Sequence, residues 1–305
     1  QTATQMNRRR FMQMMGATAG AAMLPMPLLA AVKEQKLYRW RGILLGAETG
    51  FQLYHEDAGA AKAITQKAVQ EIQRLEGMLS LYQASSDLSQ LNKYGLLRDA
   101  PTELVELLQQ AKQFSHLTNG AFDVTVQPLW QLYAQNPQPS PSQLQATLAK
   151  VNPQHLEISS RDITLHQGAQ LTLNGIAQGF ITDKIIQLLK AEGITKTLVE
   201  LGETNGLGKA WKIGLRNPQG EISEIISLQN RAVATSGGYG TPLGKHGNHL
   251  LNPQTGQSAK HHKSISVIAT NATTADALST GLSILPYAQA QEILQKLPLV
   301  EARFN

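Results

Sequence analysis

The chain has 305 residues, with 27 Lys and Arg against 22 Asp and Glu, 42% hydrophobic residues, 5% aromatic residues and no cysteine. This composition excludes a disordered chain, a collagen and a disulfide scaffold, and a chain of this length buries a sizeable core without cross-links. The net charge of +5 is small and no basic stripe alternates with aromatic residues, so we expect no nucleic-acid partner.

Residues 1–31 have the pattern of a signal peptide. The run Arg8-Arg9-Arg10 precedes an apolar stretch of small residues that ends at Ala30-Ala31. Paired arginines followed by Phe11, with glycines and prolines interrupting the apolar stretch, predict the twin-arginine type of signal; an uncleaved membrane anchor is the alternative. We therefore expect a periplasmic protein whose mature part, residues 32–305, is a single domain without a transmembrane segment.

Three helices are expected in the first half of the mature chain. Apolar residues at steps of three and four predict a long amphipathic helix from Ala58 to Leu79. A second helix is predicted between Pro101 and Gly120, because Pro favours the first helical turn and Gly the position after the last one. A short helix over residues 142–150 follows a proline-rich excursion.

The second half predicts strands that helices interrupt irregularly. Runs of β-branched and apolar residues predict strands at 156–158, 162–165, 171–173, 198–201, 211–215, 222–228, 232–235 and 264–269. Helices are expected at about 177–191, 274–285 and 288–297. Since strands and helices do not alternate strictly, as they would in a doubly wound sheet, the predicted fold class is α+β.

Five glycine-containing clusters with oxygen-bearing neighbours occur along the chain. They are residues 120–123, 174–179, 202–204, 236–240 and 249–256. Each cluster alone is typical of a turn. Together they indicate several loops that approach one phosphate-bearing ligand, because glycine lets backbone N–H groups come close to anionic oxygens.

Asp276 and Thr280 are four residues apart at the beginning of a predicted helix, and so lie on one face of it. A carboxylate and a hydroxyl in this arrangement suit Mg²⁺, with phosphate oxygens and water as further ligands. The alternative is that Asp276 only stabilises the N-terminal end of the helix.

Four histidines gather in one loop-rich region: His246, His249, His261 and His262. They lack the helical spacing of a paired metal site and the chain has no cysteine, which disfavours a transition-metal centre. His249 precedes a Pro-Gln-Thr-Gly turn and is the histidine that we expect to face a ligand.

Eight segments, in this order, resemble the ApbE family of FAD:protein FMN transferases. They are Ser80–Tyr82, Asp87–Asn92, Gly120–Val126, Gly175–Asp183, Leu201–Glu203, Thr235–Gly237, His249–Gly256 and Ala275–Thr280. The resemblance runs from about Leu45 to Leu285. It implies an ApbE-like, T-fold-like α+β fold with a ligand cleft between two intimate subdomains. The implied activity is Mg²⁺-dependent transfer of FMN from FAD to a Thr or Ser hydroxyl of an acceptor flavoprotein, with release of AMP.

The resemblance also implies the roles of individual residues. The FAD-binding set would comprise Tyr82, Ala121, Phe122, Asp123, Asp183, Glu203, Ser236, Gly237 and Thr255. Within it, Tyr82 and residues 121–123 would contact the flavin or the adenine, and Asp183 the nucleotide. The metal would be held by the backbone carbonyl of Ala177 and the side chains of Asp276 and Thr280. His249 would lie beside the pyrophosphate and accept the proton of the attacking hydroxyl.

Some residues depart from the usual family pattern. Asn174, Gln178 and Glu203 are similar to the NosX-type branch, which implies a NosR-like acceptor: the extracytoplasmic flavin-carrying domain of a membrane-bound electron-transfer protein, touched only transiently. Asn252 replaces a family aspartate, a change that could weaken the orientation or the basicity of His249. Two alternatives therefore stay open: a periplasmic FAD carrier without turnover, and a Mg²⁺-dependent FAD pyrophosphatase.

Overall fold

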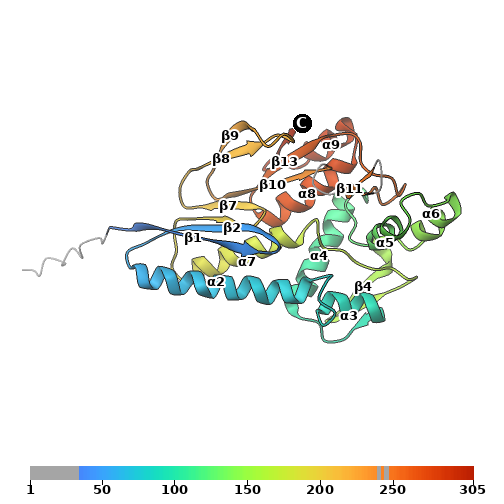
Figure 1. Cartoon of the computed structure of the whole chain (residues 1–305), viewed down its shortest axis with the longest axis horizontal. Helices are drawn as coiled ribbons and strands as arrows, with labels where there is room; N and C mark the ends of the chain where they lie inside the picture. The colour runs from blue at the N-terminus through green and yellow to red at the C-terminus, as the bar shows by residue number, and fades with distance from the viewer. Residues whose placement is uncertain (1–33, 239–241, 244–246) are drawn as a thin grey trace, which may run out of the picture. The chain divides into compact units, whose positions relative to one another are not determined.

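The computed structural model describes residues 34–238, 242–243 and 247–305 (Figure 1). The predicted signal peptide, residues 1–31, and His246 lie outside the described residues. Residues Gln35–Asn305 form one compact unit of helices and antiparallel sheets, so the predicted α+β class is confirmed. No helix within the described part of the chain combines the length and the apolar character needed to cross a membrane.

A seven-stranded antiparallel sheet lies at the centre of this unit. Its strand order is β1-β2-β6-β7-β10-β13-β14. The strands are β1 (Lys36–Leu44), β2 (Ala47–His55), β6 (Thr197–Glu200), β7 (Thr204–Leu207), β10 (Arg231–Gly237), β13 (Ser264–Ala269) and β14 (Glu301–Phe304). Three of the predicted strands, those at 198–201, 232–235 and 264–269, are therefore the central strands β6, β10 and β13.

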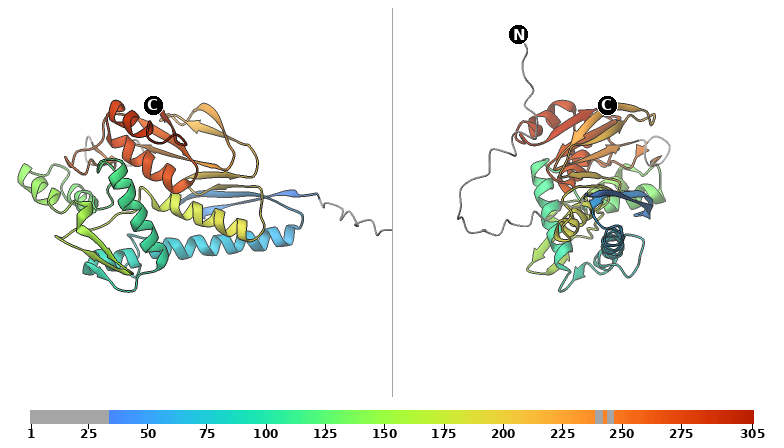
Figure 2. Two further views of the ribbon diagram at one scale, coloured as in Figure 1. Left: turned by 180° about the vertical axis from the view of Figure 1, so that it is seen from behind. Right: turned by 90° about the vertical axis from the view of Figure 1, so that its left-hand side faces the viewer.

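Both faces of the sheet are covered, because alternate residues of its strands point to opposite sides. Ala234 and Val267 pack on the face that α8 covers, whereas Val233 and Ile268 pack on the other face against the β8–β9 hairpin. Helices α2 and α7 lie on the α8 side (Figures 1 and 2). These elements are α2 (Ala58–Leu79), α7 (Ala177–Ala191), α8 (Ala272–Ile284), β8 (Trp211–Arg216) and β9 (Ile222–Leu228).

The remaining elements pack beside this layer. They are α3 (Asp87–Tyr94), α4 (Thr102–Leu117), α5 (Gln127–Gln135), α6 (Pro141–Leu148), the 3₁₀ turn Pro153–His155, α9 (Tyr287–Leu294) and the short strands β3 (Leu96–Leu97), β4 (Leu156–Ser159), β5 (Asp162–Leu165), β11 (Pro242–Leu243) and β12 (Gly247–Asn248). Strands β3, β5 and β4 form a small antiparallel sheet. The predicted second helix is α4, which begins after Pro101 and ends before Asn119 and Gly120, whose φ angles are +53° and +81°.

The strand predicted at residues 171–173 is wrong. Both backbone groups of Leu171 are bonded by the side chain of Asn92: its Nδ2 donates to the Leu171 oxygen at 2.8 Å and its Oδ1 accepts from the Leu171 nitrogen at 2.6 Å. Next to it, the Thr172 nitrogen donates to the Val124 oxygen at 2.8 Å and Gln170 forms an isolated bridge with Val126, so the segment has side-chain and backbone partners but forms no strand. The segment is extended and apolar, which explains the prediction, but it runs as an irregular connection into α7.

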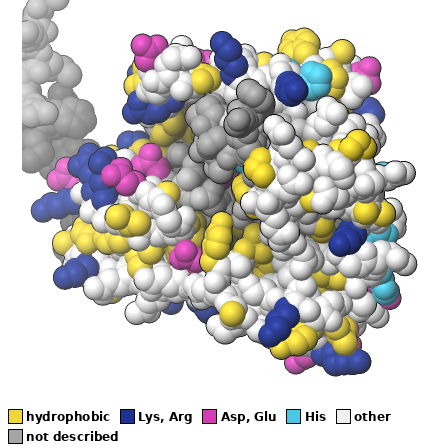
Figure 3. Space-filling view, turned by 45° about the vertical axis from the view of Figure 1, so that its right-hand side comes forward, with side chains coloured by type: hydrophobic (Ala, Val, Ile, Leu, Met, Phe, Trp, Pro, Cys, Tyr) yellow, Lys and Arg dark blue, Asp and Glu magenta, His cyan; other side chains and the backbone are white. Residues whose placement is uncertain are grey.

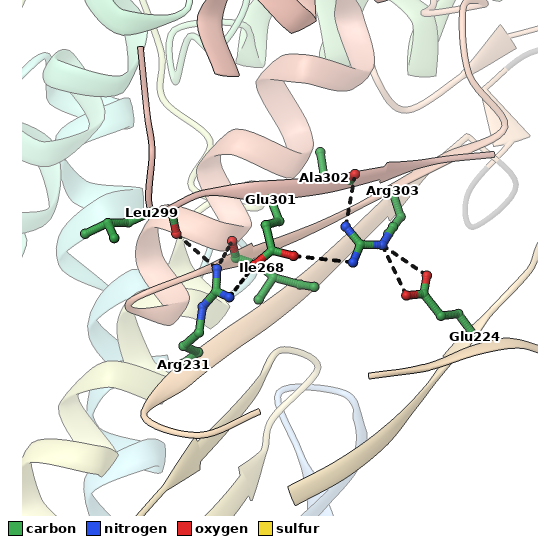
Figure 4. A network of polar contacts seen from close by, with 7 residues as sticks. All are labelled: Glu224, Arg231, Ile268, Leu299, Glu301, Ala302 and Arg303. Carbon is green, nitrogen blue, oxygen red and sulfur yellow. Dashed lines mark hydrogen bonds and ion pairs between the residues drawn. The ribbon is translucent and has the colours of Figure 1, made fainter. Parts of the chain in front are cut away.

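A network of ion pairs fixes the C-terminal strand β14 at the edge of the sheet (Figure 4). Arg231 of β10 pairs with Glu301, and Arg303 pairs with both Glu301 and Glu224 of β9. Single exposed ion pairs stabilise a protein little, but a network that joins three strands restrains their relative positions.

The side chains at the surface are mixed in type. On the face in Figure 3, hydrophobic side chains gather around the centre, and Lys and Arg side chains lie mainly toward the edges. The positive charges of this face are therefore dispersed.

Candidate functional site

A cavity of about 330 Å³ opens beside the beginning of α7 and the side of α8 that carries Asp276, Thr280 and Ile284. Each of the five glycine clusters contributes to its wall; examples are Asp123, Asn174, Glu203, Ser236 and His249. The predicted convergence of five loops is therefore confirmed. Glycine is required at one close approach in particular, because a Cβ atom on Gly175 would lie 2.9 Å from the side chain of Thr280.

Helices α7 and α8 stabilise each other's first turn by an exchange of carboxylates. Asp276 of α8 accepts a hydrogen bond from the Gly179 nitrogen at 2.9 Å, and Asp183 of α7 accepts from the Ala272 and Thr273 nitrogens at 2.8 Å each. These are backbone N–H groups that a helix leaves without partners in its first turn. The exchange fixes one oxygen of Asp276, a residue that also lines the cavity.

Glycine at position 179 makes this contact possible. A Cβ atom there would lie 2.4 Å from the Ala272 oxygen and 2.7 Å from the Asp276 Cβ. Both distances are below any ordinary van der Waals contact. The two helices can therefore cross at this depth only because residue 179 has no side chain.

Asp276 and Glu203 form a pair of buried carboxyl groups at the cavity. Burial raises the pKa of Asp276 to about 7, against the opposing hydrogen bond from Gly179. Burial, followed by the negative charge of Asp276, raises the pKa of Glu203 well above its ordinary value. Two carboxylates this close ionise together at neutral pH only when a positive charge compensates them.

The donor set at this position fits a hard divalent cation. The Oε2 atom of Glu203 is buried and has no hydrogen-bond partner among the described residues, which is costly for a carboxylate oxygen. A carboxylate of Asp276 and the hydroxyls of Ser236 and Thr280 line the same cavity. Oxygen donors of these types are the ligands that Mg²⁺ prefers. Within the described ranges, no three His, Cys, Asp or Glu side chains gather as a metal site, so protein carboxylates alone would not complete the coordination.

Asp123 is a third buried carboxyl group of the cavity. Its Oδ1 accepts hydrogen bonds from the nitrogen and the Oγ1 of Thr125, at 2.8 Å each. Burial raises the pKa of Asp123 to about 6 in spite of these two bonds. Asp123 also lines a second cavity of about 270 Å³, so its carboxyl group lies where two hollows meet.

His249 lines the central cavity, as expected from the sequence, and its backbone oxygen accepts a hydrogen bond from Trp130 Nε1 at 3.2 Å. The side chain of Asn252 bonds its own turn instead, where its Oδ1 accepts from the nitrogens of Gln254 and Thr255, at 2.8 and 3.3 Å. An aspartate oxygen would accept the same two bonds. Asn252 therefore closes this turn with bonds that an aspartate would also make, and the effect of the missing carboxylate on His249 stays a prediction.

Most of the predicted site residues meet at the central cavity, and four do not. Those that line it are Ala121, Phe122, Asp123, Glu203, Ser236, Gly237, His249, Asp276 and Thr280. Tyr82, which is 92% exposed, and Ala177 line a neighbouring cavity of about 240 Å³ that shares Asn174 and Gln178 with the central one. Asp183 faces the beginning of α8 instead, and Thr255 lies exposed on its turn.

Sequence reasoning missed several residues of the cavity wall, among them Trp130, Thr235, Leu250 and Ile284. Trp130 and Ile284 carry no motif, and their apolar side chains are typical of a core, whereas Leu250 lies within the segment 249–256, which indicates a loop but no role for this side chain. Thr235 could have been found, because it directly precedes Ser236 at the end of a predicted strand. The histidine cluster does not form a site among its described members: His262 Nε2 bonds the Leu285 oxygen at 3.0 Å, and its ring packs on Phe304.

Comparison with known proteins agrees with this architecture. A model of the ApbE family matches residues 45–304. The FAD:protein FMN transferase of Haemophilus influenzae is 30% identical over 308 residues, which cover 90% of this chain and 88% of that protein. The FAD:protein FMN transferase of Salmonella typhimurium is 29% identical over 268 residues, which cover 79% and 76% of the two chains.

Solved structures agree as well. The crystal structure of the Pseudomonas stutzeri flavinyl transferase ApbE, in its apo form, has a TM-score of 0.80 and 28% identity, and the alignment covers 90% of this chain and 92% of that chain. An ApbE protein from Thermotoga maritima has the same fold, with a TM-score of 0.80 at 24% identity. The ApbE-like fold is thus confirmed. With a family model that matches most of its length, the chain belongs to the ApbE family.

Proposed function

We propose that this protein transfers FMN from FAD to a Thr or Ser hydroxyl of an acceptor flavoprotein and releases AMP. The observation that carries the proposal is the buried pair Glu203 and Asp276 in the same cavity as His249, with one Glu203 oxygen that has no partner among the described residues. Relatives that match most of the chain are named FAD:protein FMN transferases. A carrier without turnover would need no proton acceptor beside the phosphates.

FAD needs more room than the central cavity offers. Cavities of about 240 and 270 Å³ adjoin it, one through Asn174 and Gln178, the other through Asp123 and Pro253. We assign the pyrophosphate to the central cavity and the two ring systems to the neighbours. Tyr82 is the exposed aromatic side chain that suits the stacking of a ring at one end.

The cation of this site would be Mg²⁺, held by the carboxylate of Asp276 and the hydroxyl of Thr280, with Glu203 beside them. The Ala177 carbonyl stays a predicted ligand. When bound, the cation neutralises the charge that grows on phosphate oxygens as the phosphoanhydride bond breaks. In its absence, burial and then the negative charge of Asp276 favour the protonated form of Glu203, whose pKa is raised well above its ordinary value.

The chain's own contribution to the bond change is a proton acceptor. In the proposed step the acceptor's hydroxyl oxygen bonds the FMN phosphorus, and the bond from this phosphorus to the AMP phosphate oxygen breaks. The hydroxyl proton passes to His249, a side chain that accepts protons near neutral pH. The product is a phosphoester between FMN and the acceptor, and AMP leaves.

One assay tests this function against its alternatives. The protein is incubated with FAD, Mg²⁺ and a candidate acceptor, AMP is quantified, and flavin fluorescence is read on a denaturing gel. AMP together with a fluorescent acceptor supports the transferase. AMP without labelled acceptor would identify a pyrophosphatase, and neither product a carrier. The hydrogen bonds of Asn252 do not distinguish these alternatives, because an aspartate would make the same two bonds.

We also propose that the protein works in the periplasm after twin-arginine export, on a NosR-like acceptor that it releases after modification. The support is the sequence of residues 1–31 and the NosX-like residues Asn174, Gln178 and Glu203. Replacement of Arg8 and Arg9 by Lys should leave the precursor in the cytoplasm. Undiminished periplasmic protein in that variant would contradict the export proposal.

A further inference from the structure

Three hydroxyl groups lie in a row beside the carboxylates of the cavity. The Oγ of Ser236 lies 2.7 Å from the Oγ of Ser279 and 3.3 Å from the Oγ1 of Thr280. Ser279 is fully buried and does not line the cavity itself, whereas Ser236 and Thr280 do. The Oγ of Ser279 also lies 2.9 Å from the backbone oxygen of Asp276, to which it donates a hydrogen bond.

Only one arrangement of the hydroxyl protons makes a hydrogen bond of all three contacts. A carbonyl oxygen can only accept, so in this arrangement the single proton of the Ser279 hydroxyl is donated to the Asp276 oxygen. Ser236 is then the donor in its contact with Ser279. With the proton of Ser236 used in this way, Thr280 is the donor in the contact between Thr280 and Ser236.

The consequence appears at the cavity surface. Ser236 and Thr280 both direct their protons into the protein, and only lone pairs of their oxygens remain for the cavity. An oxygen with only lone pairs to offer is a ligand for a cation and a poor partner for a phosphate oxygen, which needs a donor. Without Ser279, either hydroxyl could turn its proton toward the cavity.

We propose that Ser279 is a positioning residue that holds Ser236 and Thr280 as oxygen acceptors toward the cation. The inference rests on the proposed function for the identity of that cation. It also moves Ser236 from the phosphate-binding group, where the sequence suggested it, to the cation side of the cavity.

Ser283 offers a matched control one turn further along α8. Its Oγ donates to the Ser279 backbone oxygen at 2.6 Å and it is 3% exposed, and the hydrogen bonds of the Ser236 hydroxyl among the described residues are to Ser279 and Thr280. Ser279→Ala and Ser283→Ala each remove one buried hydroxyl bonded to a helix carbonyl. Both should lower thermal stability to a similar degree, so any difference between them reports the link to Ser236.

The experiment measures Mg²⁺ affinity by titration calorimetry without FAD, and FAD affinity by fluorescence without metal. Ser279→Ala should weaken Mg²⁺ binding about three- to tenfold, the range of one hydrogen bond, and leave metal-free FAD binding unchanged or tighter. Ser283→Ala should bind both as the wild type does. In a Ser236→Ala background, the additional Ser279→Ala substitution should not lower the Mg²⁺ affinity further.

The outcomes separate this inference from the proposed function. If Ser279→Ala and Ser283→Ala have equal Mg²⁺ affinities, whether unchanged or equally weakened, Ser279 has no positioning role, and the proposed function is untouched. An additive loss in the double variant would overturn the inference in the same way. If the wild-type protein binds no Mg²⁺ with or without FAD, the cation site of the proposed function is wrong, and the inference falls with it.

Discussion

Gly179→Ala should damage both stability and cation binding, because it forces α7 and α8 apart. The new Cβ would lie 2.4 Å from the Ala272 oxygen, whereas real Cβ contacts begin near 3.0 Å. The helices must therefore separate by about 0.6 Å, which stretches the 2.9 Å bond from Gly179 to Asp276 to about 3.5 Å, the limit of a hydrogen bond.

The expected cost combines three contributions. Overpacking costs about 1–3 kcal/mol, loss of a hydrogen bond to a charged group about 1.5–3 kcal/mol, and the better helix propensity of alanine returns about 0.5–1 kcal/mol. A net loss of about 1.5–5.5 kcal/mol lowers the midpoint of thermal unfolding by roughly 3–20 °C in a domain of this size. Circular dichroism melting measures the shift, and calorimetry measures the loss of Mg²⁺ affinity.

Gly77→Ala is the matched control. Gly77 also lies in a helix, α2, but its Cβ would come no closer than 3.9 Å to a neighbouring side chain, that of Gln83. The same chemical change should therefore leave stability unchanged or raise it by up to about 1 kcal/mol. If Gly179→Ala melts and binds Mg²⁺ as Gly77→Ala does, the close crossing of α7 and α8 does not hold Asp276, and the reasoning is refuted.

Three further predictions concern single side chains. His249→Ala should bind FAD and Mg²⁺ nearly as the wild type does but transfer FMN about 10²- to 10⁴-fold more slowly, because it lacks the proton acceptor. Single-turnover release of AMP measures this rate. A wild-type rate would mean that another group takes the proton. Asp123 has its pKa raised to about 6, so its folded form holds a proton more tightly than its unfolded form, and its contribution to stability falls as pH rises from about 4 to 6. In Asp123→Asn this part of the pH dependence of the melting temperature should disappear, and parallel curves for the two proteins would contradict the assignment. Tyr82→Ala should weaken FAD binding about two- to tenfold without a change in melting temperature. Tyr94→Ala, at another exposed tyrosine, should change neither the FAD affinity nor the melting temperature. Equal FAD affinities of the two variants would show that Tyr82 does not belong to the site.

The sequence predicts the long helices well and the first hairpin not at all. α2 and α7 begin and end where the periodic apolar residues predict, because one face of each helix is buried against the sheet. The β1–β2 hairpin escapes prediction for two reasons. Thr49, Gly50 and Phe51 are buried in succession, which removes the alternation of a strand, and the turn requires a positive φ at Leu45, a residue that rarely adopts it.

The residues of the site could be predicted wherever local chemistry decides their place. Glycine clusters indicate loops, and Asp276 with Thr280 shares a helix face whatever the helix packs against. The role of Asp183 depends instead on where α8 begins in space relative to α7, a distance of 89 residues along the chain, so its capping of Ala272 is invisible in the sequence. The hydroxyl row of Ser236 and Ser279 joins β10 to α8 and is hidden for the same reason.

The proposed function requires that the central cavity and its two neighbours hold FAD and a cation, and that FMN passes from there to a protein hydroxyl. The most direct test measures two products of a single turnover: the FMN covalently bound to the acceptor, by mass spectrometry, and the AMP released. Both amounts are determined for the wild type and for Asp276→Ala. We expect one FMN bound for each AMP released by the wild type, and neither product from Asp276→Ala. AMP released without bound FMN, or undiminished transfer by Asp276→Ala, would contradict the proposed function.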